Sequence, residues 1–231
     1  MTAPTDSDRE QDAKPEVGSK PEPERGSSAE RGPDGGAPTR ADLGIPDWDD
    51  EYLDRVADGL MYSYDLEDDY RVRGERFDLY GRMRVESRKH FFHPSLNYAN
   101  HGSTEHLFAR RATGATRDDV ERLVDLGHDL AAAWIDADEE HFSTDFTFVL
   151  LVPEIPSDVR EFVAGFKDRT LIKLGYFGHY EVNLLVVAPE REDIAASANA
   201  DVAHAFRLWR SDGTDAEPAG LVGRLIGRLR R

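Results

Sequence analysis

Two stretches of this chain are almost wholly apolar, and they constrain its fold more than any other feature. Residues 146–152 and residues 182–188 each have the length of one β-strand, and each contains a single polar side chain. Strands without a polar face are usually covered on both sides of their sheet. The two stretches therefore predict two central strands of a sheet whose faces are both buried.

Helical patterns surround these strands. Apolar residues recur at helical spacing in four segments. The first can be capped by Asp49 or Asp50, and the others begin near Thr116, Ser157 and Pro189. Thr116 and Asp119 have the spacing of a capping box, in which each side chain accepts a hydrogen bond from the other's backbone N–H group. We therefore expect about four helices, and the one from Ser157 connects the two central strands.

A third strand is indicated by alternation. Residues 76–91 alternate between charged and apolar side chains, which is the pattern of a strand with one exposed face. Residues 105–111 predict a further strand, and we expect the two to form an antiparallel hairpin. The pattern leaves open whether residues 171–177 are a separate strand turning at Gly178. The sequence thus predicts the α+β class, as a single domain with one mixed or antiparallel sheet.

The ends of the chain differ from its middle. Residues 1–45 are rich in proline, glycine and acidic residues and contain few large apolar side chains. Such a segment buries too little surface to offset its chain entropy, so it predicts a disordered tail. The globular domain is expected over residues 46–210, followed by a polar linker at 211–220.

The last segment, residues 221–231, predicts a basic amphipathic helix. Leu225, Ile226 and Leu229 fall on one helical face, and Arg228 lies outside it. A helix this short needs a surface on which to fold. The pattern leaves three alternatives: docking on a partner or an anionic membrane surface, docking on its own domain, or a frayed end.

Charge indicates the environment of the protein. The chain has 46 acidic residues against 29 basic ones, a net charge of -17, and only five of the basic residues are lysines. This composition resembles that of cytosolic proteins from salt-accumulating halophilic archaea, where molar salt shortens the Debye length to about 3 Å and screens self-repulsion. Neither a signal peptide nor a membrane-spanning run is apparent, so we expect a cytoplasmic location.

The chemistry available is limited by the absence of cysteine. Without cysteine the chain has no disulfides, no thiol nucleophile and no thiolate ligand for a metal. Histidines and carboxylates could provide a metal site instead, although the spacing of the histidines favours solvated loop residues. The candidates are His90, His93, His101, His106, His141 and His179, with Glu105, Asp145 or Glu181 as oxygen ligands.

Positive charge is concentrated on one side of the strand predicted at residues 76–91. That side carries a row of mostly charged residues: Arg76, Asp78, Tyr80, Arg82, Arg84, Glu86, Arg88 and His90. Guanidinium groups bind phosphate and carboxylate in a bidentate manner. We therefore expect a non-catalytic domain that binds an anionic ligand or a protein partner through Arg82, Arg84, Arg88, Tyr80 and His90.

Two alternatives to this interpretation remain. Asp78 and Glu86 could pair with the arginines, so that the row only stabilises the sheet. Nucleic acid is weakly supported as a ligand, because binding that depends on phosphate contacts alone weakens steeply in high salt. We expect no cofactor.

An enzyme is the second functional hypothesis. The order of predicted elements resembles the core of restriction-endonuclease-like nucleases, in which an aspartate and a Glu-x-Lys motif share a metal. Here Asp78 is followed by Glu86-Ser87-Arg88, so arginine stands at the lysine position. The resemblance implies a metal-dependent hydrolase or nuclease with Asp78 and Glu86 as metal ligands. Arginine cannot serve as a tunable base, so a catalytic role is less favoured than binding.

A further acidic pair closes the two apolar stretches. Glu154 and Glu190 each follow a proline just beyond the predicted strands. If the strands are parallel neighbours, the two carboxylates meet at their carboxyl ends, where α/β proteins bind ligands. Proline and glutamate are also ordinary residues at the start of a helix, and this is the simpler interpretation.

Four stretches are similar to an uncharacterised domain family known from halophilic archaea. The resemblance covers about 160 residues and implies no activity, because the family has none assigned. The stretches are Phe77-Asp78-Leu79-Tyr80-Gly81-Arg82-Met83-Arg84, Lys89-His90-Phe91-Phe92-His93-Pro94, His141-Phe142-Ser143-Thr144-Asp145-Phe146 and Gly178-His179-Tyr180-Glu181-Val182-Asn183-Leu184.

Overall fold

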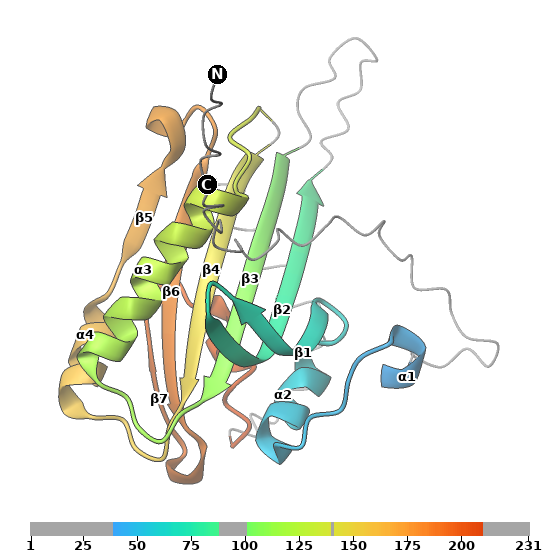
Figure 1. Ribbon diagram of the computed structural model, residues 1–231, viewed down its shortest axis with the longest axis vertical. Coiled ribbons are helices and arrows are strands. Elements are labelled where there is room, and N and C mark those ends of the chain that lie inside the picture. Colours follow the sequence, from blue (N-terminus) through green and yellow to red (C-terminus); the bar gives the residue numbers. More distant parts are fainter. Residues whose placement is uncertain (1–38, 88–100, 140, 210–231) are drawn as a thin grey trace, which may run out of the picture.

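The computed structural model describes residues 39–87, 101–139 and 141–209 (Figure 1). Most of the tail predicted to be disordered lies outside these ranges, as do the predicted linker and the basic C-terminal segment. Predictions for the following residues therefore stay predictions: Arg88, His90, His93, Leu225, Ile226, Arg228 and Leu229.

The fold is built on one mixed sheet of seven strands, which confirms the predicted class. The strand order is β1-β2-β3-β4-β6-β5, and β7 pairs with β6. The pairs β1–β2, β2–β3, β5–β6 and β6–β7 are antiparallel, whereas β3–β4 and β4–β6 are parallel. The strands are β1 (Asp65–Val72), β2 (Glu75–Ser87), β3 (His101–Arg111), β4 (His141–Leu151), β5 (Asp168–Leu171), β6 (His179–Ala188) and β7 (Asp193–Ala196).

Both faces of the central strands are buried, as their apolar sequences predicted. One face packs against α3 (Arg117–Trp134) and α4 (Ser157–Gly165), and α3 crosses in front of β4 and β6 in Figure 1. The other face packs against α2 (Glu51–Leu60) and a short 3₁₀ helix, η3 (Asp201–His204). Side chains of β4 alternate between the two: Phe146 and Phe148 contact the α3 side, and Val149 contacts the α2 side.

Three helices begin where the sequence predicted them. Asp50 caps α2 by accepting hydrogen bonds from the backbone N–H groups of Tyr52 and Leu53. Thr116 and Asp119 form the predicted capping box at the start of α3, with N···O distances of 2.8 and 3.2 Å. The third helix, α4, starts at Ser157 directly after Pro156.

The helix predicted to follow Pro189 is wrong. Pro189–Arg191 form a 3₁₀ turn, η2, and Glu192 has a positive φ of 51°. This left-handed residue reverses the chain, so that β7 pairs antiparallel with β6 instead of continuing as a helix. The apolar residues that suggested a helix are still buried, since Val202 and Phe206 pack on the α2 side of the sheet.

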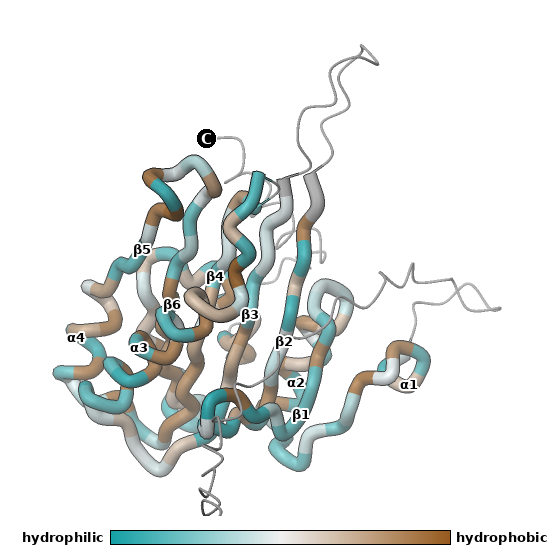
Figure 2. Tube along the Cα trace, turned by 45° about the horizontal axis from the view of Figure 1, so that its top comes forward, coloured by the Kyte–Doolittle hydropathy of each residue, from teal (hydrophilic) through white to brown (hydrophobic). Residues whose placement is uncertain are grey.

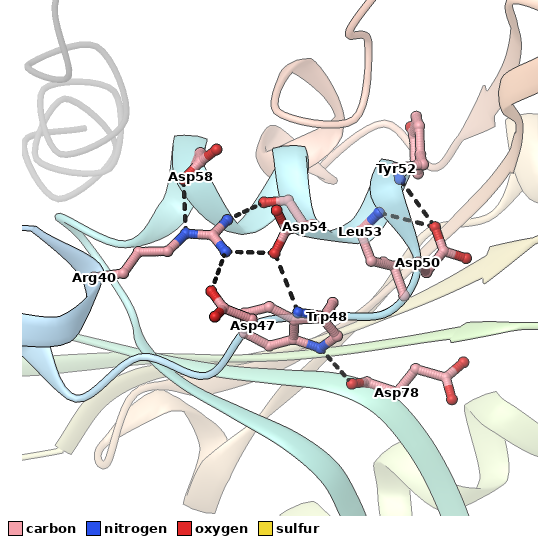
Figure 3. Close-up of polar contacts among 9 residues, drawn as sticks. All are labelled: Arg40, Asp47, Trp48, Asp50, Tyr52, Leu53, Asp54, Asp58 and Asp78. Carbon is pink, nitrogen blue, oxygen red and sulfur yellow. Dashed lines mark hydrogen bonds and ion pairs between the residues drawn. The ribbon is translucent and has the colours of Figure 1, made fainter.

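The described part of the chain includes a short helix within the segment predicted to be a tail. Arg40 lies in this helix, α1 (Arg40–Leu43). Its guanidinium group forms ion pairs with Asp47, Asp54 and Asp58 (Figure 3). Trp48 is fixed by the same network, because Asp54 accepts its backbone N–H group at 3.1 Å. Residues 39–50 are thus attached to α2.

Residues 171–177 are mostly a turn and not a strand. The separate strand β5 precedes them and ends at Leu171, antiparallel to β6, and the connection includes the 3₁₀ turn η1 (Ile172–Gly175) before Gly178. Gly178 has a φ of 72°, and a Cβ atom there would lie 1.9 Å from the carbonyl oxygen of Phe142. Only glycine fits this position without displacing β4.

Candidate functional site

Strand β2 carries the arginine row, but part of that row is buried. Tyr80 is 1% exposed, and its ring stacks on Tyr70 with the centroids 4.0 Å apart. The prediction that Tyr80 lies on an exposed face is therefore wrong. The alternating pattern suggested a half-exposed sheet, whereas this face packs in the core on the α3 side. Arg82 and Arg84 follow on the same face, nearer the end of the strand.

A pocket opens where α3 stops covering the sheet. The helix ends at Trp134, and the next residue already has extended backbone. Beyond that point the sheet face is polar, and it encloses a pocket of about 160 Å³. The lining residues come from β2, β3, β4 and the segment after α3: Arg82, Arg84, Thr104, His106, Trp134, Ile135, Asp136, His141 and Thr144.

Strand register explains why these residues meet. Arg84 lies opposite Thr104, and Thr104 lies opposite Thr144 on the next strand. Arg82 lies opposite His106 in the adjacent row. Because side chains at alternate positions share a face, the two rows project toward the same side of the sheet. The pocket is thus a patch of the sheet surface, assembled from three strands.

His106 is a neutral side chain in the wall of the pocket. Burial, with the positive charges of Arg82 and Arg84, lowers the pKa of this imidazole to about 3. Its Nδ1 atom lies 2.8 Å from the hydroxyl oxygen of Tyr80, and burial raises the pKa of that phenol, which keeps it protonated. A Tyr80 hydroxyl that donates to Nδ1 leaves the ring proton on Nε2. In this arrangement His106 is a hydrogen-bond donor without charge.

The other polar groups of the pocket differ in how fully they are engaged. Nδ1 of His141 donates to the carbonyl oxygen of Phe177 at 2.7 Å, and Nε2 lies 2.9 Å from the Thr144 hydroxyl. Arg82 is 11% exposed and reaches Asp65 at 3.4 Å. Arg84 is exposed, and within the described part of the chain it has no carboxylate within ion-pairing distance. Arg84 is therefore the cation best placed to meet a ligand.

The two proposed metal ligands on β2 lie at opposite ends of the strand. The Asp78 carboxylate accepts the backbone N–H of Arg111 at 2.8 Å, whereas Glu86 pairs with Gly102 at the other end. Eight strand residues span about 26 Å. This separation is far too long for one metal ion to bridge. In residues 39–87, 101–139 and 141–209, no three Asp, Glu or His side chains are placed to hold a metal ion.

Asp78 belongs instead to an acidic depression at the end of β2 that lies away from Glu86. This depression has a volume of about 380 Å³, and aspartates predominate in its lining. Arg111 lies among them and forms ion pairs with Asp50 and Glu190. Glu154, the other acid of the predicted pair, forms an ion pair with Arg191. Both glutamates are thus bound to arginines.

The three proposed oxygen ligands do lie side by side. Glu105, Asp145 and Glu181 are register partners on β3, β4 and β6 and face the α2 side, away from the pocket. Glu105 accepts from Thr147 at 3.2 Å, and Glu181 accepts from Asn199 at 2.9 Å.

Sequence reasoning did not predict this row, although a signal was present. Each of the three acids comes directly before the buried run of its strand, so parallel strands that start together align them.

The geometry defines a class of protein: an α+β domain whose mixed sheet carries a small cationic pocket at the end of its longest helix. More particularly, the chain belongs to the family described as "Domain of unknown function (DUF8052)", whose model matches residues 49–208. This confirms the resemblance to an uncharacterised family. Searches of the curated proteins and of the solved structures found no match. None of the helices described has the length and apolar composition needed to cross a membrane.

Proposed function

We propose that this protein is a non-catalytic binding domain, and that its pocket holds the phosphate or carboxylate group of a small ligand between Arg82 and Arg84. One observation carries the proposal. Two arginines project into one pocket beside the uncharged donor His106, and Arg84 has no carboxylate partner in the described part of the chain.

The spacing of the two arginines suits a single oxyanion. Residues two apart on a strand are separated by about 7 Å along the backbone, so both guanidinium groups can contact the same group of oxygens. The Thr104 hydroxyl and Nε2 of His106 add neutral donors nearby. Salt weakens directed hydrogen bonds of this kind less than it weakens attraction between charges alone, which matters for the halophilic, cytoplasmic setting that the composition favours.

The remaining groups of the pocket indicate what else the ligand carries. Asp136 lines the pocket, and the last carbonyl groups of α3 end beside it. A carboxylate and a helix C-terminus both favour hydrogen-bond donors over further negative charge. The ligand that fits has one anionic group together with a hydroxyl or amino group, packed against the ring of Trp134.

Size limits the ligand as well. Pockets for drug-sized ligands measure about 300–1,000 Å³, and this one measures about 160 Å³. The pocket therefore suits a small metabolite, or only the anionic end of a longer molecule.

Calorimetric titration with inorganic phosphate and with a hydroxycarboxylate tests the proposal, in chloride buffers of constant ionic strength. Arg84→Gln should weaken binding at least tenfold, because a charged hydrogen-bonding partner is removed. Arg55→Gln makes the same chemical change on the exposed surface of α2 and should leave the affinity unchanged. If neither probe binds, or if both variants lose affinity equally, the pocket is not an anion site.

The metal-dependent hydrolase hypothesis gains no comparable support. Its two ligands, Asp78 and Glu86, lie at opposite ends of β2.

A further inference from the structure

The turn between β5 and β6 exposes apolar side chains that a globular domain normally buries. Leu174 is 91% exposed, Tyr176 is 86% exposed and Leu171 is 58% exposed. Across the described residues, these make up three of the four large apolar side chains that are strongly exposed; the fourth is Tyr62. Figure 2 shows the hydrophobic colour at the end of β5. An exposed apolar cluster of this kind commonly marks an interaction site.

The backbone of this turn is strained rather than loose. Lys173 and Leu174 have φ angles of 45° and 61°, and Gly175 has one of 91°. Residues other than glycine rarely adopt this left-handed region, and strained conformations persist only where the surrounding structure holds them. Here the backbone N–H of Ile172 donates to the carbonyl of Gly178 at 3.0 Å, which closes the turn.

The base of the turn is anchored to the neighbouring strand. Gly178 packs directly against the backbone of Phe142 at the start of β4. Next to it, the carbonyl group of Phe177 accepts a hydrogen bond from His141 at 2.7 Å. The turn is therefore fixed at its base, and Leu174 and Tyr176 are held at defined positions.

The turn also lacks the negative charge of the rest of the chain. About one residue in five is acidic overall, yet residues 169–180 contain no Asp or Glu. Lys173 is exposed at the tip, and its ammonium group lies 4.8 Å from the ring centre of Phe177. An apolar tip that carries a cation matches the interface of an anionic bilayer, where Lys meets the head groups and Tyr lies at the boundary.

Area distinguishes a lipid surface from a protein partner. A stable protein interface buries about 800 Å² on each partner. Three exposed side chains on a narrow turn offer about half of that at most, since a large aromatic side chain contributes only about 150–250 Å². A bilayer closes around an inserted tip and needs no matching shape.

We propose that the turn at residues 171–177 is a membrane-contact tip, which inserts Leu174 and Tyr176 into the interface of a bilayer that contains anionic lipids. The site is separate from the anion pocket, and it requires no membrane-spanning helix. It also differs from the basic segment at residues 221–231, whose predicted docking stays untested.

Co-sedimentation of the full chain with lipid vesicles tests this proposal. The vesicles consist of phosphatidylcholine alone or mixed with phosphatidylglycerol, at low and at molar salt. Leu174→Asn replaces the apolar side chain by a polar one, and asparagine tolerates the left-handed backbone. Tyr176→Ser removes the aromatic ring. Tyr62→Ser is the matched control, because Tyr62 is a 53% exposed tyrosine outside the turn.

The wild type and Tyr62→Ser should sediment with the mixed vesicles. Each turn variant should lose about tenfold in partition coefficient, and the double variant about a hundredfold, because burying one large apolar side chain contributes about one to two factors of ten. Binding should persist in part at molar salt, since the apolar contribution is not screened. Lys173→Gln should weaken binding to the mixed vesicles only.

Three results would overturn the proposal. The wild type could fail to bind the mixed vesicles, or the double variant could bind as well as the wild type, which would place the contact elsewhere in the chain. Alternatively, light scattering could show a dimer that Leu174→Asn dissociates while vesicles bind nothing, which would make the turn a protein interface. Phosphate titration of the double variant tests the anion pocket in a separate experiment.

Discussion

Replacing Gly178 by alanine tests how firmly the β5–β6 turn is fixed to the sheet. The residue has a φ of 72°, and the added Cβ atom would lie 1.9 Å from the Phe142 carbonyl oxygen and 2.9 Å from its Cα atom. Backbone atoms cannot rotate away as a flexible side chain can. Either β6 separates from β4 at this end, or the turn changes its conformation.

The free-energy cost of the Gly178→Ala substitution has two parts. A left-handed residue with a Cβ atom costs about 1–2 kcal/mol, and forcing an extra carbon into a packed region costs about 1–3 kcal/mol. We therefore expect Gly178→Ala to lower the free energy of unfolding by about 3 kcal/mol. In a domain of this size each kcal/mol shifts Tm by about 2–4 °C, so Tm should fall by roughly 6–12 °C.

Gly59→Ala is the matched control for this experiment. Gly59 lies in α2, and a Cβ atom added there would have no atom within 4 Å. Alanine should stabilise the protein by about 0.5–1 kcal/mol through its higher helix propensity. Thermal and urea unfolding of both variants give the comparison. A Gly178→Ala protein within about 0.5 kcal/mol of wild type would show that the turn is not held as described.

Three further perturbations test other parts of the structure. His106 has a pKa of about 3 in the folded protein and titrates near its ordinary value of 6.5 when the protein is unfolded. Between these pH values the unfolded state binds more protons than the folded state. The free energy of unfolding should therefore fall as pH falls from about 6.5 toward 3. For this residue the loss of unfolding free energy approaches about 1.4 kcal/mol per pH unit. Urea unfolding at several pH values should show that the stability of His106→Gln depends less steeply on pH than that of the wild type. Equal slopes for the two proteins would contradict a buried neutral imidazole. Thr116→Ala removes the capping box of α3 and should cost about 1 kcal/mol in chemical denaturation. Arg40→Gln breaks the partly buried contact with Asp54 and the exposed contact with Asp58, and should cost about 1 kcal/mol. Amide exchange in residues 39–50 should become faster, and unchanged exchange there would contradict the attachment of α1.

Local signals were sufficient for much of the fold. The apolar stretches were confirmed as central strands because a run without polar residues has no exposed arrangement. Thr116 and Asp50 were confirmed as caps because capping joins a side chain to backbone N–H groups only two or three residues further along the chain. The prediction for the segment after Pro189 failed for the opposite reason. Its apolar spacing fits a helix, and only antiparallel pairing with β6 makes residues 193–196 a strand.

The candidate pocket depends on information that is not local. Arg82 and Arg84 were identified from their residue types, yet which of their neighbours are buried depends on where α3 ends against the sheet. That end point buries Tyr80 and leaves Arg84 exposed, four positions along the same strand face. The contribution of Thr104 and Thr144 follows from strand register, which a single sequence does not specify. That of Asp136 follows from the place where α3 ends.

His141 gives the two proposed binding surfaces a common component. One nitrogen of its ring is bonded to the turn at Phe177, and the other faces Thr144 in the pocket wall. A ligand that competes for the Thr144 hydroxyl acts on the same imidazole that supports the turn. Thermodynamic linkage then requires reciprocity: any factor by which a pocket ligand alters vesicle affinity is the factor by which vesicles alter ligand affinity. A domain of this kind would report at one surface on the occupancy of the other.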